Sequence, residues 1–362
     1  MPLTKRLNNI DGWRAIACLG VLYGHVLGTL GSPKWVLGGI DWLMVMNLWG
    51  YGVHLFFVIS GLCFYLVLDK QNEITKKSVL QFWKKRWLRI APAYYVAVLV
   101  YAMISQGAFD LNLFRKVIIN FLFIQPYLQG MEISAIFWSL SVECFFYLIL
   151  PFLFLCIRRI GLGYIVIFLI LSGCIFNGLH YAGYLASGNN SWYYQFPANY
   201  AHFAWGILIG YLYKNEKLNH RLLQSLSGLI LGLGMAYLGK LSFYSGAIRM
   251  AEEFGWLLNT IGPLLMTLGF SVMILVSLRN VFLSKIIGNP ILSFVGRISY
   301  SFYLWHALLL GLIYNYFNEL FSSTPTGVVL LFILSAIIIV PVSWLSYQFF
   351  EAFYFSNKNH KA

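Results

Sequence analysis

Long apolar stretches recur along the whole sequence and are separated by short polar connections. A helix needs about 20 mostly apolar residues to cross a bilayer, and ten stretches approach that length. They cover residues 11–30, 45–68, 90–108, 138–157, 162–180, 198–213, 222–239, 256–278, 296–317 and 327–350. The pattern predicts an all-α polytopic membrane protein with about ten transmembrane helices.

A further apolar stretch, residues 117–128, is short for a span and contains Pro126, so we predict a re-entrant or interfacial segment. If it does not cross, 19 of the 25 Lys and Arg residues are cytoplasmic and five are outside, with Arg14 inside the first span. If it crosses, the split becomes 11 to 13. Basic residues concentrate in cytoplasmic loops, so the ten-span arrangement with both termini cytoplasmic is favoured.

Composition excludes several other classes of protein. Of the 362 residues, 60% are hydrophobic and only 10% are charged, whereas a soluble domain has roughly 25% charged residues. A soluble domain and a disordered chain are therefore excluded. The formal net charge of +13 follows mainly from topology, so we expect no nucleic-acid partner. One transmembrane domain is predicted over residues 1–355, with a short cytoplasmic tail at 356–362.

The first predicted span contains three ionisable residues, Asp11, Arg14 and His25. A charged residue at the bilayer centre costs about 2.5–3.5 kcal/mol on insertion scales, so each is a candidate for function. Arg14 and His25 share one helix face and lie ~16 Å apart along the axis. We predict Arg14 near the cytoplasmic boundary and His25 in the outer half of the bilayer. The alternatives are an arginine anchor paired with Asp11 and a hydrogen-bonded core histidine.

Glu143 lies a little below the outer end of the fourth span, at the depth that His25 has in the first. A carboxylate inside a membrane needs a proton or a cationic partner. A His25–Glu143 pair provides that partner and fixes the imidazole tautomer, which leaves the other ring nitrogen as a general base. The alternative is a protonated Glu143 bonded to a neighbouring backbone group or to Ser141.

Arg86 and Arg89 stand at the cytoplasmic entrance of the third span, and their i, i+3 spacing puts both on one helix face. Paired guanidinium groups suit phosphate recognition. With Arg14 at the same depth, they predict an anionic ligand on the cytoplasmic side. The neighbouring lysines are better explained by the preference of basic residues for that side.

Other candidates carry weaker signals. We assign substrate contacts to Asp11, Ser141, Trp138 and Tyr303, and we predict no metal ligands. Tyr303 belongs to an aromatic stripe that packing also explains. His54 and His306 lie within spans and are candidates for lining the cavity, although a single histidine there is more often structural. The uncharged aromatic loop at 181–197 suits stacking on sugar rings, and an interfacial aromatic belt explains it equally well.

Five stretches carry a resemblance to a known family: NIDGWRAIACLGVLYGH at 9–25, FFVISGLCF at 56–64, RWLRIAPAYY at 86–95, FWSLSVECFFYLILP at 137–151 and GRISYSFYLWH at 296–306. In them, and in their order, the chain resembles the acyltransferase-3 family, membrane O-acyltransferases that modify bacterial surface glycans and related molecules. One departure is Cys144, where many relatives have a second acidic or polar residue. Some relatives carry a C-terminal extracytoplasmic esterase-like domain, and we expect none here.

The resemblance implies ten transmembrane helices in a bacterial inner (plasma) membrane, surrounded by membrane lipid, with acyl-CoA as the cytoplasmic donor and a glycan acceptor outside. It assigns the catalytic histidine to His25, donor binding to Arg14, Arg86 and Arg89, and the acidic residue to Glu143. We therefore expect an O-acetyltransferase that uses acetyl-CoA, without a metal, on a cell-surface polysaccharide such as lipopolysaccharide O-antigen. Whether His25 acts as a general base or forms a covalent acyl-histidine stays open.

The main alternative is a proton-coupled transporter or flippase of a glycan or lipid-linked substrate. In that interpretation Asp11, His25 and Glu143 form a proton relay. Transporters frequently contain inverted repeats and paired broken helices, and no repeat is evident in the sequence. The acyltransferase hypothesis is therefore preferred.

Overall fold

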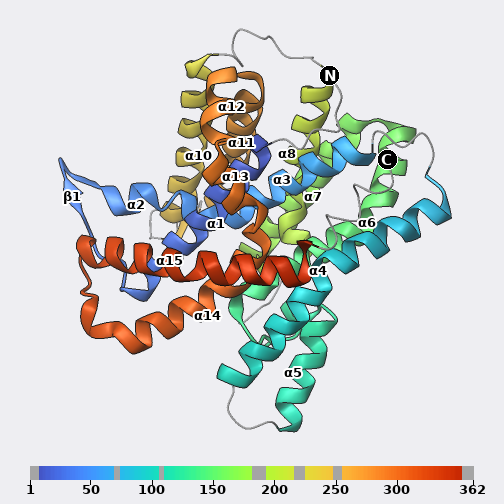
Figure 1. The fold of residues 1–362 in the computed structure, drawn as a ribbon. Helices are drawn as coiled ribbons and strands as arrows, with labels where there is room; N and C mark the ends of the chain where they lie inside the picture. Colours follow the sequence, from blue (N-terminus) through green and yellow to red (C-terminus); the bar gives the residue numbers. More distant parts are fainter. Residues whose placement is uncertain are drawn as a thin grey trace. The chain divides into compact units, whose positions relative to one another are not determined.

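Nearly all of the chain that the structure describes is helical (Figure 1). The computed structural model describes residues 8–68, 74–105, 110–181, 193–215, 225–247 and 255–352. Within these residues, β structure is limited to one antiparallel pair, β1 (Val36–Leu37) and β2 (Ile40–Asp41). The predicted all-α class is confirmed, while the predicted tail at 356–362 lies outside the described residues.

The helices follow the apolar stretches closely. In chain order they are α1 (Asn8–Thr29), α2 (Trp42–Met46), α3 (Gly52–Leu68), α4 (Lys76–Ser105), α5 (Leu111–Phe121), α6 (Trp138–Ile160), α7 (Leu162–Tyr181), α8 (Phe196–Lys214), α10 (Leu226–Ala247), α11 (Gly255–Arg279), α12 (Val281–Ile287), α13 (Pro290–Arg297), α14 (Ser299–Phe317) and α15 (Pro325–Phe350). Short turns of 3-10 helix are η1 (Trp49–Tyr51), η2 (Gln125–Tyr127), η3 (Ala135–Phe137) and η5 (Asn318–Leu320).

Seven helical segments of the described chain are long and apolar enough to cross a membrane: Trp42–Val67, Lys76–Ile104, Ala135–Ile160, Leu162–Tyr181, Leu226–Phe243, Gly255–Arg279 and Pro325–Phe350. They support a multi-pass membrane protein and coincide with seven of the predicted stretches. The other three stretches form α1, α8 and α14, of 22, 19 and 19 residues. These helices contain more polar side chains, among them His25, His202 and His306. The total of ten spans and the cytoplasmic termini stay predictions.

The short apolar stretch at 117–128 forms no continuous helix. α5 ends at Phe121, and Phe123 then takes a positive φ of 60° before the η2 turn that contains Pro126. With 11 residues, α5 is only about 16 Å long, half of the ~30 Å bilayer core. The described residues thus contain no continuous helix of spanning length at this place, and whether the segment crosses the bilayer stays a prediction.

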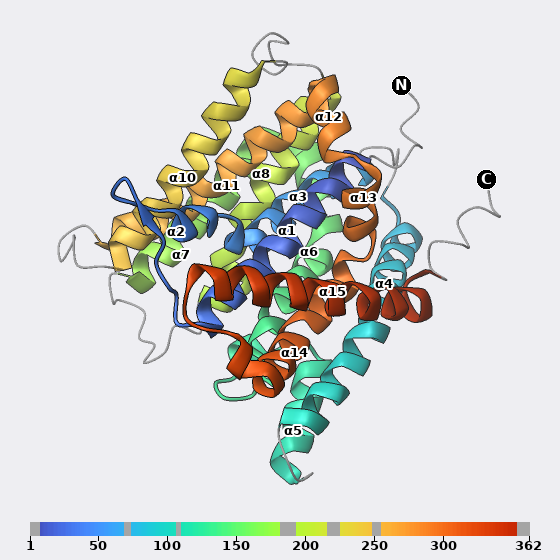
Figure 2. The same cartoon turned by 60° about the vertical axis from the view of Figure 1, so that its left-hand side comes forward.

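The described residues pack into two compact units. The first lies within 1–53, 87–108 and 287–362, and the second within 54–86 and 109–286, so α4 contributes to both. In the first unit α1 packs against α13, α14 and α15, and Figures 1 and 2 show α14 and α15 side by side. In the second unit α10 lies along α11, and α7 packs against α8. One transmembrane domain over 1–355 stays a prediction.

Two glycines let the start of α1 approach its neighbours closely. A Cβ on Gly296 of α13 would lie 1.7 Å from the carbonyl oxygen of Asp11. A Cβ on Gly12 would lie 1.8 Å from the carbonyl oxygen of Ile287. No side chain fits at either position unless a helix moves, so this packing fixes the charged start of α1.

Gly296→Ala should destabilise the protein. Overpacking costs about 1–3 kcal/mol, which outweighs the ~1 kcal/mol that alanine gains over glycine inside a helix. The matched control is Gly311→Ala in α14, where a Cβ meets nothing within 4 Å, and it should be neutral or slightly stabilising. Thermal unfolding of the purified protein in detergent compares the two variants. Equal melting temperatures would contradict the close approach of α13 to α1.

Candidate functional site

His25 in α1 lies beside a second histidine, His306 of α14, with ring centroids 5.1 Å apart. His306 is fully buried, and its Nδ1 lies 2.6 Å from the carbonyl oxygen of Tyr303. A carbonyl oxygen only accepts hydrogen bonds, so Nδ1 carries the hydrogen and Nε2 keeps a lone pair in the neutral ring. Within the described residues Nε2 has no hydrogen-bond partner. A buried imidazole with an unused acceptor therefore stands next to His25, whose side chain is exposed.

A side chain from α4 fixes α14 at this position. Tyr101 Oη donates to the carbonyl oxygen of Leu304 and accepts from the backbone N–H of Leu308, both at 2.9 Å. In a regular α-helix these two backbone groups pair with each other, so the tyrosine hydroxyl is inserted into the helical ladder. His306 lies between them in sequence. The insertion therefore holds the turn that carries His306 against α4.

Charged side chains of the first unit collect near the start of α1. Arg14 lies 3.7 Å from Asp11. Glu351, directly after α15, is only 1% exposed and accepts a hydrogen bond from Ser301 Oγ at 2.6 Å. The positive charges of Arg89 and Arg14 act on the same carboxyl group. This cluster joins α1, α4, α14 and the end of α15, and it brings together two of the three arginines predicted to bind the donor.

Burial dominates the ionisation of Glu351. It raises the pKa of this carboxyl group to about 7, although the Ser301 hydrogen bond and the charges of Arg89 and Arg14 act to lower it. A large share of Glu351 is therefore protonated at neutral pH.

Glu143 belongs to the second unit and has partners there. It accepts hydrogen bonds from Ser60 Oγ of α3, at 3.2 Å, and from Tyr147 Oη, one turn further along α6. The alternative partner considered for Glu143 was Ser141, whose buried Oγ has no hydrogen-bond partner within the described residues. His25 lies in the first unit, and its pairing with Glu143 stays a prediction.

Arg86 is packed against aromatic rings of the second unit. Its guanidinium carbon lies 4.4 Å from the ring centroid of Phe64, 5.4 Å from that of Phe82 and 5.5 Å from that of Tyr147. Stacking uses the faces of a guanidinium group, whereas hydrogen bonding to phosphate uses its edge. Arg86 and Arg89 lie about one helical turn apart in α4 but have different surroundings. Aromatic rings surround Arg86, whereas Arg89 acts on the carboxyl group of Glu351.

A second pair of histidines lies in the second unit. His54 and His202 are buried, with ring centroids 4.8 Å apart. His54 Nε2 lies 3.0 Å from Tyr193 Oη, and His202 Nδ1 lies 3.1 Å from Thr267 Oγ1. These contacts join α3, α8 and α11. Among the described residues, no three His, Cys, Asp or Glu side chains form a group that could hold a metal ion.

The two aromatic candidates for substrate contact have different surroundings. Trp138, the first residue of α6, lies beside Tyr194, with ring centroids 5.1 Å apart. Tyr303 is buried, and its ring lies 5.2 Å from that of His306. Tyr303 therefore contributes to the first unit as a neighbour of His306, while Trp138 belongs to the second unit.

Sequence reasoning assigns no catalytic or binding role to His306, which it treats only as a weak cavity-lining candidate, and it does not single out Glu351. A signal for His306 exists, because it ends one of the five family stretches. The signal for Glu351 is a lone acidic residue directly after an apolar span. Neither signal identifies the residue with which His306 or Glu351 interacts, because those residues lie in distant parts of the sequence.

These features define a multi-pass helical membrane protein in which one unit carries a histidine pair and a cluster of arginines and carboxyl groups. The chain belongs to the acyltransferase-3 family, because the sequence profile of that family, described as an acyltransferase domain, matches residues 7–348. The match covers all five stretches quoted above. The resemblance inferred from them is therefore confirmed.

Named relatives of the chain include O-acetyltransferases. The chain is 25% identical to the O-acetyltransferase OatA of Staphylococcus aureus strain NCTC 8325 / PS 47 over 371 residues, which cover 96% of this chain and 57% of the relative. OatA of Staphylococcus aureus strain COL gives the same identity and coverage. The chain thus spans a little over half the length of these relatives. No solved structure gives a significant match.

Glu351 should make the protein less stable as pH rises. Its pKa is raised from 4.5 to about 7, so its contribution to the free energy of unfolding is fully present below pH 4.5 and is lost as pH rises through about 7. The effect is at most ~3.4 kcal/mol. Thermal unfolding between pH 4.5 and 8 should show this slope, and Glu351→Gln should remove it. Glu319→Gln changes an exposed acid and should leave the slope unchanged. An identical slope for wild type and Glu351→Gln would contradict the assignment.

Proposed function

We propose that the protein is a membrane O-acetyltransferase of a bacterial inner (plasma) membrane. It transfers an acetyl group from cytoplasmic acetyl-CoA to a hydroxyl of a cell-surface polysaccharide on the outer side, such as lipopolysaccharide O-antigen. The observation that carries this proposal is the His25–His306 pair. His25 lies on the same helix, α1, as Arg14, the residue proposed to bind the donor. The family and the O-acetyltransferase relatives support the same class of reaction.

In this proposal His25 is the general base. Its ring takes the proton of the acceptor hydroxyl while the hydroxyl oxygen attacks the thioester carbonyl carbon. The C–S bond then breaks, and the coenzyme leaves as a thiol after receiving the proton from His25. A positioned base of this kind contributes about 10²–10⁴-fold to a rate.

A base of this kind must be held in one tautomer. His306 keeps a lone pair on Nε2, and an N–H of His25 that donates there leaves the other His25 nitrogen unprotonated. Glu143 is the second candidate for this orienting role. A carboxylate would also stabilise the imidazolium that forms during the reaction.

The arginines bind the phosphates of the donor. Arg14 and Arg89 are positively charged whatever the state of Glu351, because a guanidinium group is not deprotonated in proteins, and Asp11 positions Arg14 from 3.7 Å. Arg86 is held by its aromatic neighbours. The ~16 Å between Arg14 and His25 along α1 suits the long flexible arm of coenzyme A, which carries the thioester towards the base.

His25→Ala should abolish acetyl transfer, a loss of at least about 100-fold, with expression and membrane insertion intact. His306→Ala should lower kcat and shift the pH profile of kcat, with little change in the KM for acetyl-CoA. Transfer of radiolabelled acetyl groups by the purified protein and mass spectrometry of surface glycans measure both. His180→Ala, a histidine of α7 in the second unit, is the control. Full acylation by His25→Ala would sink the proposed function.

Arg89→Ala and Arg86→Ala should each raise the KM for acetyl-CoA about 10- to 100-fold, because a charged hydrogen bond contributes about 1.5–3 kcal/mol, and should change the acceptor KM much less. Acetyl-CoA that lacks its 3′-phosphate identifies the arginine that binds this phosphate. The variant without that arginine should have the same KM for acetyl-CoA with and without the 3′-phosphate. Lys285→Ala, an exposed cation, is the control. A larger effect on acceptor than on donor would move the donor site elsewhere.

A further inference from the structure

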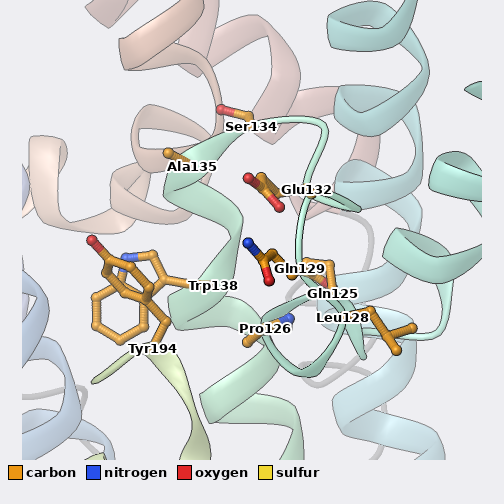
Figure 3. Close-up of a pocket in the computed structure, with 10 residues that line it drawn as sticks. Gln125, Pro126, Leu128, Gln129, Glu132, Ser134, Ala135, Trp138 and Tyr194 are labelled. Atoms are coloured by element: carbon orange, nitrogen blue, oxygen red, sulfur yellow. The ribbon is translucent and has the colours of Figure 1, made fainter. Parts of the chain in front are cut away.

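A pocket of about 220 Å³ lies at the start of α6 (Figure 3). Two aromatic rings, Trp138 and Tyr194, stand together on one side of it. Gln129 and Glu132 extend towards them from the loop that precedes α6, and Ser134 adds a hydroxyl group. The pocket therefore combines an aromatic wall with a set of polar groups.

The lining favours a neutral ligand with several hydroxyl groups. Amide, hydroxyl and carboxylate groups supply both donors and acceptors of hydrogen bonds. Aromatic faces carry the negative part of the ring quadrupole and attract weakly positive C–H groups, such as those on the face of a sugar ring. The described lining contains no Lys or Arg but includes Glu132, so an anionic ligand such as the donor is disfavoured.

The size of the pocket limits the ligand further. Pockets for drug-sized ligands have volumes of roughly 300–1,000 Å³, and this pocket is smaller. It suits one sugar ring better than several. A longer glycan would place one ring in the pocket and extend the rest outside it.

Hydrogen bonds hold the walls of the pocket in place. Tyr127 Oη accepts from the backbone N–H of Phe196 at 3.3 Å, which links the loop before α6 to the start of α8. Asn199 Nδ2 donates to the carbonyl oxygen of Tyr193 at 2.7 Å and so fixes the residue before Tyr194. A preformed pocket of this kind loses little conformational entropy when a ligand binds.

The pocket lies at one end of α6, and Arg158 and Arg159 occupy the last turn at the other end. Since basic residues mark the cytoplasmic side, the pocket faces outside. We infer that it binds one sugar ring of the acceptor glycan, with Trp138 and Tyr194 stacking on the ring. This inference rests on the proposed function and adds the site at which the acceptor is recognised.

Direct binding tests the pocket without any transfer reaction. Saturation-transfer NMR of the purified full-length protein uses N-acetylglucosamine and glucose as probes and glycerol as the open-chain control. Tyr194→Ala and Gln129→Ala, which change exposed side chains, should weaken sugar binding about five- to tenfold. Tyr164→Ala removes a 74% exposed tyrosine near the opposite end of α6 and should change nothing. Absence of sugar binding, or binding unchanged in Tyr194→Ala, would overturn the inference.

Kinetics separate this inference from the proposed function. Tyr194→Ala should raise the acceptor KM about five- to tenfold and leave the KM for acetyl-CoA unchanged. If the wild-type protein binds the sugars but transfers no acetyl group, the proposed function fails and the pocket stands. If Tyr194→Ala and Gln129→Ala transfer acetyl groups with an unchanged acceptor KM, the pocket assignment fails and the function stands.

Discussion

Lipid offers no hydrogen bonds, so most polar groups within a bundle of apolar helices pair inside the protein, and this constraint organises the first unit around α14. Ser301 of that helix donates to Glu351, and the carbonyl oxygen of Tyr303 accepts from His306. Tyr101 in turn satisfies two backbone groups of α14. An unsatisfied buried polar group costs about 1–3 kcal/mol, so these bonds keep one face of α14 in a single position. That position sets His306 beside His25.

The helices and the register of Arg14 with His25 could be predicted from sequence because both depend on local periodicity. The limits of the helices could not. The stretch at 90–108 marks the apolar part of α4, whereas the helix begins at Lys76, since hydropathy detects the lipid-compatible part of a helix and not its polar extension. The partners of His25 and of the arginines were also beyond prediction. His306 and Glu351 reach them only through the packing of α14 and α15, which leaves no local pattern.

The contacts of Glu143 are compatible with a further partner. A carboxylate has about four lone-pair positions, and the hydrogen bonds from Ser60 and Tyr147 occupy two of them. Both donors are neutral hydroxyl groups, so neither balances the charge of an ionised Glu143. These two hydroxyl groups leave room for a cationic partner, which a carboxylate inside a bundle of apolar helices needs unless it is protonated.

Charge offers a physical basis for keeping the two proposed substrates, a charged donor and a neutral acceptor, at separate sites. Under the proposed function, the positive charges of Arg14 and Arg89 favour the phosphates of the donor over a neutral sugar. The nearby Glu351 carboxyl group, whose pKa burial raises to about 7, is about half protonated at neutral pH. The pocket at the start of α6 has the opposite character, because Glu132 repels a phosphate while the aromatic wall favours an uncharged ring. Under the proposed function, each site would therefore disfavour the ligand of the other by its charge. An enzyme that joins a charged donor to a neutral acceptor gains from this arrangement, because neither substrate blocks the other site when its concentration is high.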